Sequence, residues 1–130
     1  MEKHRFYYCQ VCGNIIEKIH DSGNELTCCM RTMMEIEPGT TDGKIEFHVP
    51  ICEISNDTVT VRVGQEPHPM AEDHYIEWIE LITDKSISRK YLKPGEKAEA
   101  KFCLFDGEKV CAIYAYCNKH KLWKAKCNLS

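Results

Sequence analysis

The sequence predicts a mainly β protein, in which a small cysteine-rich unit precedes an antiparallel β-sandwich of about seven strands. Three observations lead to this fold class. Short runs rich in β-branched and aromatic residues recur along most of the chain, and turn residues separate them. No long segment keeps the 3.6-residue period of an amphipathic helix. Four cysteines gather in the first 29 residues, ahead of most of these runs.

The predicted strands follow one another closely after residue 44. Valines alternate with polar residues from Val59 to Val63, which is typical of a half-buried strand. Lys93–Glu96 has proline second and glycine third, as in a type II turn. Asp106-Gly107 between two runs indicates a β-hairpin. The expected strands are Ile45–Ile54, Val59–Val63, Tyr75–Ile82, Ser86–Leu92, Ala98–Phe105, Lys109–Cys117 and Leu122–Cys127.

Two domains are expected. Residues 1–37 carry the cysteine-rich unit, which is too short to bury a core alone, so a bound metal must supply its stability. The segment Pro38–Gly43 is dense in turn residues and is interpreted as a linker. Residues 38–130, which include this linker, hold all the strands of the predicted sandwich and form the second domain.

Composition excludes several classes of protein. The N-terminus lacks the apolar core of a signal peptide, and no apolar run approaches the roughly 20 residues of a membrane span. The formal net charge is −3, so attraction to nucleic acid is not expected. The nine cysteines, with five proposed as metal thiolates, fit a reducing cytoplasm better than an oxidising compartment.

Four cysteines near the N-terminus predict a metal site. Cys9 and Cys12 form a C-x2-C pair, and Cys28 and Cys29 follow. Gly13 directly after Cys12 allows a turn whose backbone amides point back at the sulfurs. The adjacency of Cys28 and Cys29 is unusual because neighbouring side chains diverge. We therefore expect a distorted four-sulfur iron or zinc site.

A second donor set lies in the predicted sandwich. It combines one thiolate, from Cys117, with the imidazoles of His48, His68, His74 and His120. Imidazole suits iron, copper, nickel and zinc, and a single thiolate adds a strongly donating ligand. Five donors exceed the four of a structural zinc site and leave one octahedral position for a small ligand. The donors fall at strand ends and in loops, where they can converge at one edge. This pattern predicts a redox enzyme.

The remaining cysteines and lysines have weaker interpretations. Cys52, Cys103 and Cys111 lie in apolar runs and are expected to be small buried residues, whereas Cys127 is a candidate exposed thiol. Four lysines with no acid among them, Lys119, Lys121, Lys124 and Lys126, follow Cys117. They form either a solvated strand face or a field that attracts an anion to the metal.

The motifs together resemble a known family. The four N-terminal cysteines are similar to those of the desulforedoxin iron module. Glu46–Pro50, His68–Met70 with His74–Ile79, and Cys117–Trp123 resemble the catalytic domain of superoxide reductases. The two-domain form is desulfoferrodoxin, and the resemblance covers essentially the whole chain.

This resemblance implies an immunoglobulin-like sandwich, a cytoplasmic homodimer and two iron ions per chain, without haem or flavin. Centre I would be held by Cys9, Cys12, Cys28 and Cys29. Centre II would have its four histidines in a plane and Cys117 on the axis. Glu46 matches the family's mobile glutamate, which can occupy the sixth position of the ferric site. Rubredoxin or a similar protein is the implied electron donor.

The chain departs from the family pattern at two positions. Phe47 stands where the family has a lysine thought to attract superoxide and to help order water for proton delivery. Lys121 stands where the motif commonly has glycine. Lys121 or Lys119 is therefore a candidate for steering the substrate.

The expected reaction is one-electron reduction of superoxide to hydrogen peroxide, with uptake of two protons. The family resemblance, more than any residue count, favours reduction over dismutation. One alternative is a non-catalytic electron-transfer protein with two irons, and another is a zinc-ribbon interaction module. Whether centre I relays electrons or is structural is left open by the sequence.

Overall fold

The computed structural model describes residues 5–39 and 43–127. The chain divides into two compact units, Met1–Glu37 and Pro38–Ser130, which are described separately below. Residues 40–42 of the predicted linker lie outside the described residues.

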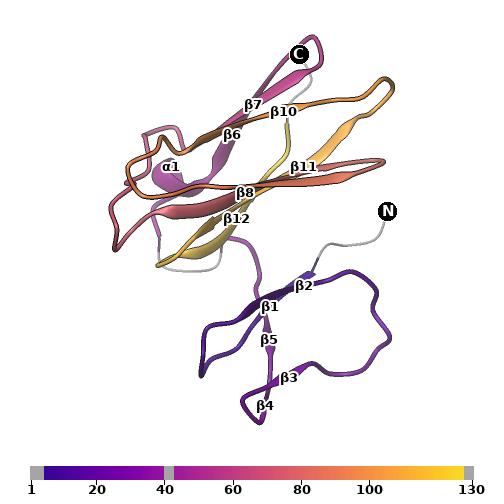
Figure 1. Cartoon of the computed structure of the whole chain (residues 1–130), viewed down its shortest axis with the longest axis vertical. Coiled ribbons are helices and arrows are strands. Elements are labelled where there is room, and N and C mark those ends of the chain that lie inside the picture. Colours follow the sequence, from indigo (N-terminus) through magenta and orange to yellow (C-terminus); the bar gives the residue numbers. More distant parts are fainter. Residues whose placement is uncertain (1–4, 40–42, 128–130) are drawn as a thin grey trace. The chain divides into compact units, whose positions relative to one another are not determined.

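The first unit is built on a small antiparallel sheet with strand order β2-β1-β5 and a separate two-stranded ribbon, β3-β4 (Figure 1). The strands are β1 Arg5–Tyr8, β2 Ile15–Lys18, β3 Thr27–Cys28, β4 Arg31–Thr32 and β5 Met34–Glu35. Among its described residues, the buried apolar side chains are Phe6, Cys9, Met33 and Ile36. So small a core agrees with the expectation that a metal ion adds stability to this unit.

The second unit is a sandwich of two antiparallel sheets. The three-stranded sheet has the order β10-β7-β6, and the four-stranded sheet has the order β12-β11-β8-β9. The strands are β6 Pro50–Ser55, β7 Thr58–Val63, β8 Ile76–Thr83, β9 Ile87–Tyr91, β10 Glu99–Cys103, β11 Val110–Cys117 and β12 Lys121–Ala125. The mainly β fold class predicted from the sequence is confirmed.

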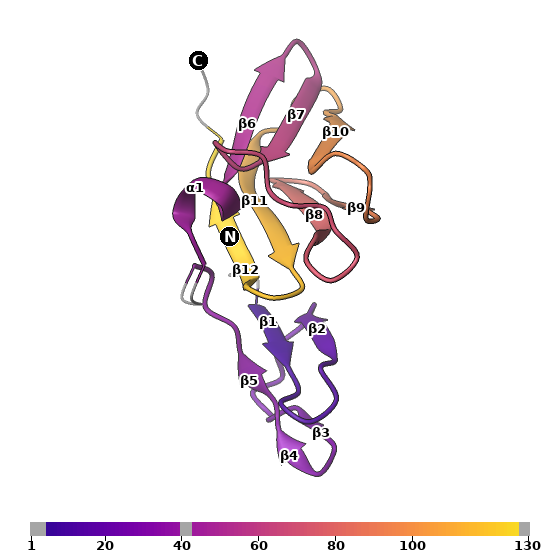
Figure 2. The ribbon, with the colours of Figure 1, turned by 90° about the vertical axis from the view of Figure 1, so that its left-hand side faces the viewer.

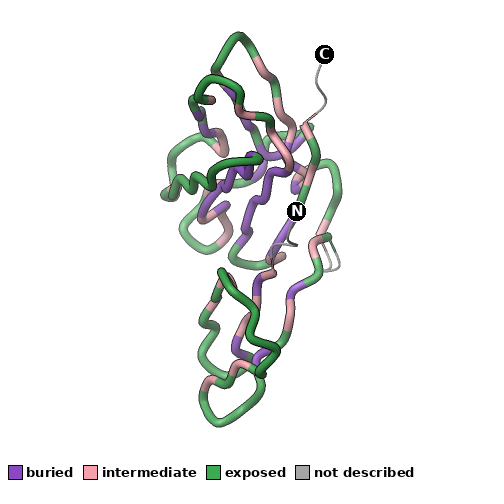
Figure 3. Tube along the Cα trace, turned by 90° about the vertical axis from the view of Figure 1, so that its right-hand side faces the viewer, coloured by how far each residue is buried: buried purple, intermediate pink, exposed green. Residues whose placement is uncertain are grey.

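The core lies between the two sheets, and alternate residues of the inner strands fill it. Figure 3 shows buried segments concentrated in these strands. From the three-stranded sheet, β7 contributes Val59, Val61 and Val63, which occupy alternate positions of the strand. The facing residues of the four-stranded sheet include Ile79, Leu81, Ile113, Ala115 and Cys117. Cys117 ends β11, so the predicted thiolate ligand is anchored in the core.

A one-turn helix, α1 (Ile45–His48), replaces the first half of the strand predicted at Ile45–Ile54. The strand-like composition of this run favoured a strand, but the backbone N–H of Val49 bonds to the Ile45 carbonyl at 3.0 Å and closes a helical turn. Proline disfavours helical geometry at the residue before it. Val49, which precedes Pro50, is accordingly extended, and the helix ends at His48. Figure 2 shows α1 as a single turn before β6.

No helix among the described residues is long and apolar enough to cross a membrane.

Two predicted turns have different outcomes. The type II turn is confirmed, since Glu96 N–H bonds to the Lys93 carbonyl at 3.1 Å and Gly95 has a φ of 90°. The prediction of a β-hairpin at Asp106-Gly107 is wrong. A turn does form there, but β10 pairs with β7 whereas β11 pairs with β8 and β12. Lys109 bonds through its N–H to the Asp84 carboxylate at 2.9 Å, which directs the chain into the other sheet.

The interpretation of the remaining cysteines is largely wrong. Cys52 and Cys127 form a disulfide and are both only partly buried, so Cys52 is not a small buried apolar residue and Cys127 is not an exposed thiol. Cys103 is exposed because it alternates with the buried Phe102 and so faces away from the core, whereas Cys111 is only partly buried and lies at an irregularity in the pairing of β11 with β8.

Candidate metal centres

The four cysteines of the N-terminal unit lie together, with all sulfur atoms within 4.8 Å of one another. The Cys28 sulfur is 3.6 Å from that of Cys12 and 4.0 Å from that of Cys29. Four thiolates bound tetrahedrally at about 2.3 Å from a metal lie about 3.8 Å apart. The spacing therefore fits one metal ion.

Two tight turns bring these sulfurs together. Gly13 has a φ of 82°, and its N–H bonds to the Cys9 carbonyl at 2.9 Å, which folds the C-x2-C loop back on itself. Between β3 and β4, Cys29 and Met30 have φ values of 53° and 63°. This left-handed pair is how the chain makes two adjacent cysteine side chains converge.

The electrostatics of this cluster call for a cation. Backbone N–H groups of Cys12 and Val11 lower the pKa of Cys9 to about 6. Interactions with the sulfurs of Cys12, Cys9 and Cys28 raise the pKa of Cys29 to about 12. Four adjacent sulfurs cannot all be thiolates without a positive charge among them. A divalent or trivalent metal ion supplies that charge, so the donor set fits iron or zinc.

The four predicted histidines of the sandwich also converge. The Nε2 atom of His48 is 3.1 Å from Nε2 of His68 and 3.0 Å from Nδ1 of His120. Nitrogens bound at about 2.1 Å in a square plane lie about 3.0 Å from their neighbours. The two measured contacts match that spacing.

Ring distances give the order of the histidines around the site. Neighbouring rings have centroids 4.6, 4.7, 4.8 and 5.1 Å apart and meet nearly edge to face. His48 and His74 are 6.4 Å apart and tilted by only 31°. The cyclic order is therefore His48, His68, His74, His120, with His48 opposite His74.

Backbone carbonyls orient two of these rings. The Nδ1 atom of His48 is 2.7 Å from the Lys44 carbonyl oxygen, and that of His68 is 2.7 Å from the Pro69 carbonyl oxygen. Each Nδ1–H donates to its carbonyl, which leaves Nε2 free to bind a metal. The Nε2 atom of His74 is buried and has no hydrogen-bond partner among the described residues. An unpartnered buried nitrogen at this point fits a metal ligand.

Cys117 approaches the ring of histidines from the protein interior. Its side chain is fully buried, and its sulfur is 3.8 Å from Nδ1 of His120. Burial raises the pKa of this thiol, whereas the backbone N–H groups of His120 and Lys119 act in the opposite direction. A metal ion is therefore needed to hold Cys117 as a thiolate.

The histidines are held in the form that binds metals. Burial, with smaller contributions from the neighbouring rings, lowers the pKa of His68 to about 4. Burial is also the largest cause of the lowered pKa values of His48 and His74. Neutral imidazole is the ligand form, so these three rings are ready to bind a cation at neutral pH.

Comparison with known families agrees with this arrangement. The sequence profile of the family described as Desulfoferrodoxin matches residues 40–126, and that of the desulfoferrodoxin N-terminal domain matches residues 1–36.

The chain belongs to the desulfoferrodoxin family. The resemblance inferred from its motifs is thereby confirmed.

Individual relatives match along both units. The chain is 45% identical over 124 residues to the desulfoferrodoxin of Nitratidesulfovibrio vulgaris, which covers 95% of this chain and 97% of the relative. It is 47% identical over 119 residues to the desulfoferrodoxin homolog of Archaeoglobus fulgidus, with coverages of 92% and 94%. Among solved structures, the superoxide reductase from Treponema pallidum superposes with a TM-score of 0.80 at 30% identity. That match covers 96% of this chain and 100% of the other.

A pocket of about 340 Å³ opens onto the histidine site. Three of the four rings line it, together with Gly43, Lys44, Phe47 and Pro69. Cys117 is not among the lining residues, so the pocket reaches the rings from a side other than that of the thiolate. The site is thus accessible to a small molecule from solvent.

The candidate steering and sixth-ligand residues lie outside the lining of this pocket. Lys121 and Lys119 do not line this pocket, and the Lys119 ammonium is 3.9 Å from the Asp73 carboxylate. Glu46 is exposed on α1 and is also absent from the lining. Lys44, which the sequence interpretation missed, does line it. Lys44 is the residue directly before α1, and its carbonyl accepts a hydrogen bond from Phe47 N–H at 3.2 Å; no sequence pattern identified it, because a strand was expected here.

Asn118 is a second residue that the sequence interpretation missed. Its side chain accepts a hydrogen bond from Tyr75 N–H at 2.9 Å and donates one to the Asp73 carbonyl at 3.1 Å. These bonds join the loop that carries His74 to the loop that carries His120. The place of Asn118 within the Cys117–His120 motif is the signal for this role.

Close packing holds α1 against the site. Trp123 stacks on His48 with ring centroids 4.7 Å apart, and its indole N–H bonds to the His120 carbonyl at 3.0 Å. A Cβ at Gly43 would lie 2.9 Å from the Trp123 ring and 3.0 Å from His120. A Cβ at Gly64 would lie 2.9 Å from the backbone of α1. Both glycines therefore permit the approach that places His48.

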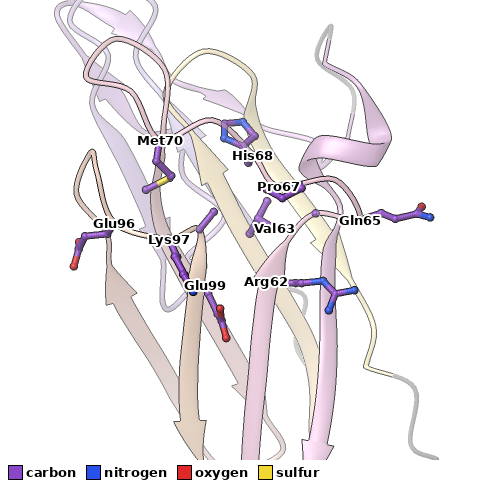
Figure 4. Close-up of a pocket in the computed structure, with 11 residues that line it drawn as sticks. Arg62, Val63, Gln65, Pro67, His68, Met70, Glu96, Lys97 and Glu99 are labelled. Atoms are coloured by element: carbon purple, nitrogen blue, oxygen red, sulfur yellow. The ribbon is translucent and has the colours of Figure 1, made fainter.

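A second pocket, of about 470 Å³, lies beside His68 at the ends of β7 and β10. Figure 4 shows His68 at one end of it, with Val63 and Pro67 nearby and Gln65 pointing away. Both acidic and basic side chains border this pocket, so its charge favours no class of ligand.

Proposed function

We propose that this chain is a superoxide reductase, which reduces superoxide by one electron, with two protons, to hydrogen peroxide. The observation that carries the proposal is a ring of four imidazoles with a buried thiolate and an open pocket. The similarity to the Treponema pallidum superoxide reductase over nearly the full length of both chains supports it.

We propose iron for both centres. His48, His68, His74, His120 and Cys117 would hold the catalytic ion, and Cys9, Cys12, Cys28 and Cys29 would hold the other. When bound, the catalytic iron supplies the electron and a coordination position for a small anion. The N–H groups of Lys119 and His120 would moderate the donor strength of the Cys117 sulfur.

The pocket residues would control access of the substrate. Lys44 supplies a positive charge at the pocket, which favours entry of an anion. Phe47 restricts the space beside His48 without offering a proton. Protons would therefore reach the product from solvent through the open pocket rather than from Phe47. Glu46 remains a candidate sixth ligand of the oxidised site, which requires movement of its exposed side chain toward the rings.

The wider setting of the protein is part of the same proposal. A cytoplasmic location would keep the seven free cysteines reduced. A rubredoxin-like protein would return electrons after each turnover. We further propose a homodimer, in keeping with the family resemblance. The four-cysteine centre would either relay electrons or stabilise its unit.

The deciding experiment mixes anaerobically reduced, iron-loaded protein with a pulse of superoxide. A reductase forms one molecule of hydrogen peroxide per superoxide consumed and no dioxygen. A dismutase forms one per two and releases dioxygen. Cys117→Ser should abolish the reaction, whereas His20→Ala, which alters an exposed histidine outside both centres, should leave it intact. Absence of any reaction in the native protein would favour the non-catalytic electron-transfer alternative.

A further inference from the structure

The Cys52–Cys127 disulfide joins two segments of the chain, each of which closely follows a ligand of the histidine site. Cys52 lies in β6, which begins two residues after His48. Cys127 follows β12, which begins one residue after His120. The bond therefore connects the segments that position two neighbouring rings, whose nitrogens are 3.0 Å apart.

The two strands have no other covalent or ladder connection. β6 is an edge strand of the three-stranded sheet, and β12 is an edge strand of the four-stranded sheet. Hydrogen-bonded pairing holds each strand to its own sheet only. The disulfide thus closes one side of the sandwich, where side-chain packing alone would otherwise join the sheets.

The position of the pair suits reversible chemistry. Cys127 lies two residues beyond the end of β12, outside the hydrogen-bonded ladder, so it can separate from Cys52 without breaking strand pairing. Both residues are only partly buried, and small oxidants and reductants can reach them. Their Cα atoms are 5.3 Å apart, within the usual range for a disulfide.

We propose that Cys52 and Cys127 form a redox-sensitive lock on the histidine site, closed by hydrogen peroxide and opened by a dithiol reductant. One thiolate attacks peroxide and yields a sulfenic acid and, after protonation, water. The second thiol displaces a second water and forms the disulfide. Two sulfurs are each oxidised by one electron, and the two peroxide oxygens are reduced. A dithiol reverses the step by thiol–disulfide exchange and becomes a disulfide itself.

The closed lock would stabilise the sandwich and slow the loss of metal from the histidine site. Cross-linking chain positions separated by 75 residues removes much of the freedom of the unfolded chain. The physiological source of peroxide rests on the proposed function, but the chemistry of the pair does not.

The test uses full-length, iron-loaded protein that has been reduced with a dithiol, freed of it, and treated with one equivalent of hydrogen peroxide. Free thiols are then alkylated, and tryptic peptides are analysed by mass. We expect a cross-linked Cys52–Cys127 peptide, a thermal midpoint raised by roughly 10 °C, and about tenfold slower release of iron to a chelator. Added peroxide makes the result independent of superoxide reduction.

Matched variants identify the pair. The Cys103→Ser and Cys111→Ser variants should behave as the native protein, because neither residue belongs to the lock. The Cys52→Ser and Cys127→Ser variants should form no cross-link and should match the reduced native protein in midpoint and iron release. The proposal is overturned if peroxide forms no cross-link. It is equally overturned if the cross-linked and reduced proteins release iron at the same rate.

Discussion

The side chain of Asn118 binds the backbone on both sides of His74, through the N–H of Tyr75 and the carbonyl of Asp73. Asn118 itself lies next to Cys117 in sequence. One amide therefore ties the segment that follows the thiolate to the loop that carries His74. Residues that orient ligands in this way are typically worth 10- to 100-fold in metal affinity.

We expect Asn118→Ala to lower the affinity of the histidine site for metal by about tenfold or more, because the His74 loop loses both bonds. Competition with a chelator, followed by metal analysis of each centre, measures the effect. Asn24→Ala, on an exposed loop of the first unit, is the control. Equal affinities in the two variants would show that the loops are held without Asn118.

The metal-free protein should lose stability as the pH falls from about 6.5 to about 4. An unfolded histidine has a pKa of about 6.5, whereas burial lowers that of His68 to about 4. In this range the unfolded state binds a proton that the folded state does not, so the free energy of unfolding decreases as the pH decreases. Above about pH 6.5 His68 is neutral in both states, so it no longer makes the free energy of unfolding depend on pH.

Urea unfolding at a series of pH values measures this dependence. The fluorescence of Trp78 and Trp123, the two tryptophans of the chain, reports on the second unit alone. His68→Gln should make the dependence shallower, and His20→Gln should not. A slope unchanged by His68→Gln would mean that the other buried rings account for it.

Lys44→Ala should slow the second-order reaction with superoxide by roughly threefold, which corresponds to one charge acting across about 7 Å of largely aqueous medium. The salt dependence of the rate should also become shallower, because steering by charge is screened. Lys121→Ala should have a smaller effect, since Lys121 does not line the pocket. Pulse-generated superoxide across a salt series provides the measurement.

Lys101→Ala, on the exposed face of β10, is the control for total charge. Phe47→Lys should act in the opposite direction to Lys44→Ala, because it adds a positive charge to the lining of the same pocket. If the rate of the native protein does not depend on salt, no lysine contributes to attraction of the substrate.

Cys12→Ser should disrupt the four-cysteine centre and leave the direct reaction of the reduced histidine site with superoxide within about twofold of native. The reason is that each donor set is complete within its own unit. Separate metal analysis and rapid mixing test this. If the variant keeps iron in the histidine site but no longer reacts, the four-cysteine centre is essential to the reaction.

Much of both centres could be predicted from sequence because their donors lie in short motifs. Spacing and residue type were sufficient for the four cysteines, and the histidines were placed at strand ends. The lysine that attracts the substrate to the pocket could not be predicted in this way. Lys44 lies at the pocket because α1 is one helical turn, whereas the strand-like composition of this run indicated a strand.

Pairing and bonding between segments that are distant in the sequence were also not predicted correctly. The Asp106-Gly107 turn chemistry is local and was recognised, but the choice of strand partner depends on how the two sheets pack. The Cys52–Cys127 bond spans 75 residues and depends on two edge strands meeting, which no local pattern encodes. Local propensity predicts elements, whereas tertiary packing decides their pairing.

The left-handed pair Cys29 and Met30 has a consequence for the fate of newly made protein. Each non-glycine residue in this conformation costs about 1–2 kcal/mol, which metal binding must offset. Before metal arrives, this turn would relax and the segment around the fully exposed Met30 would open. The strain in this turn therefore couples metal binding to local folding of the segment that carries Cys28 and Cys29.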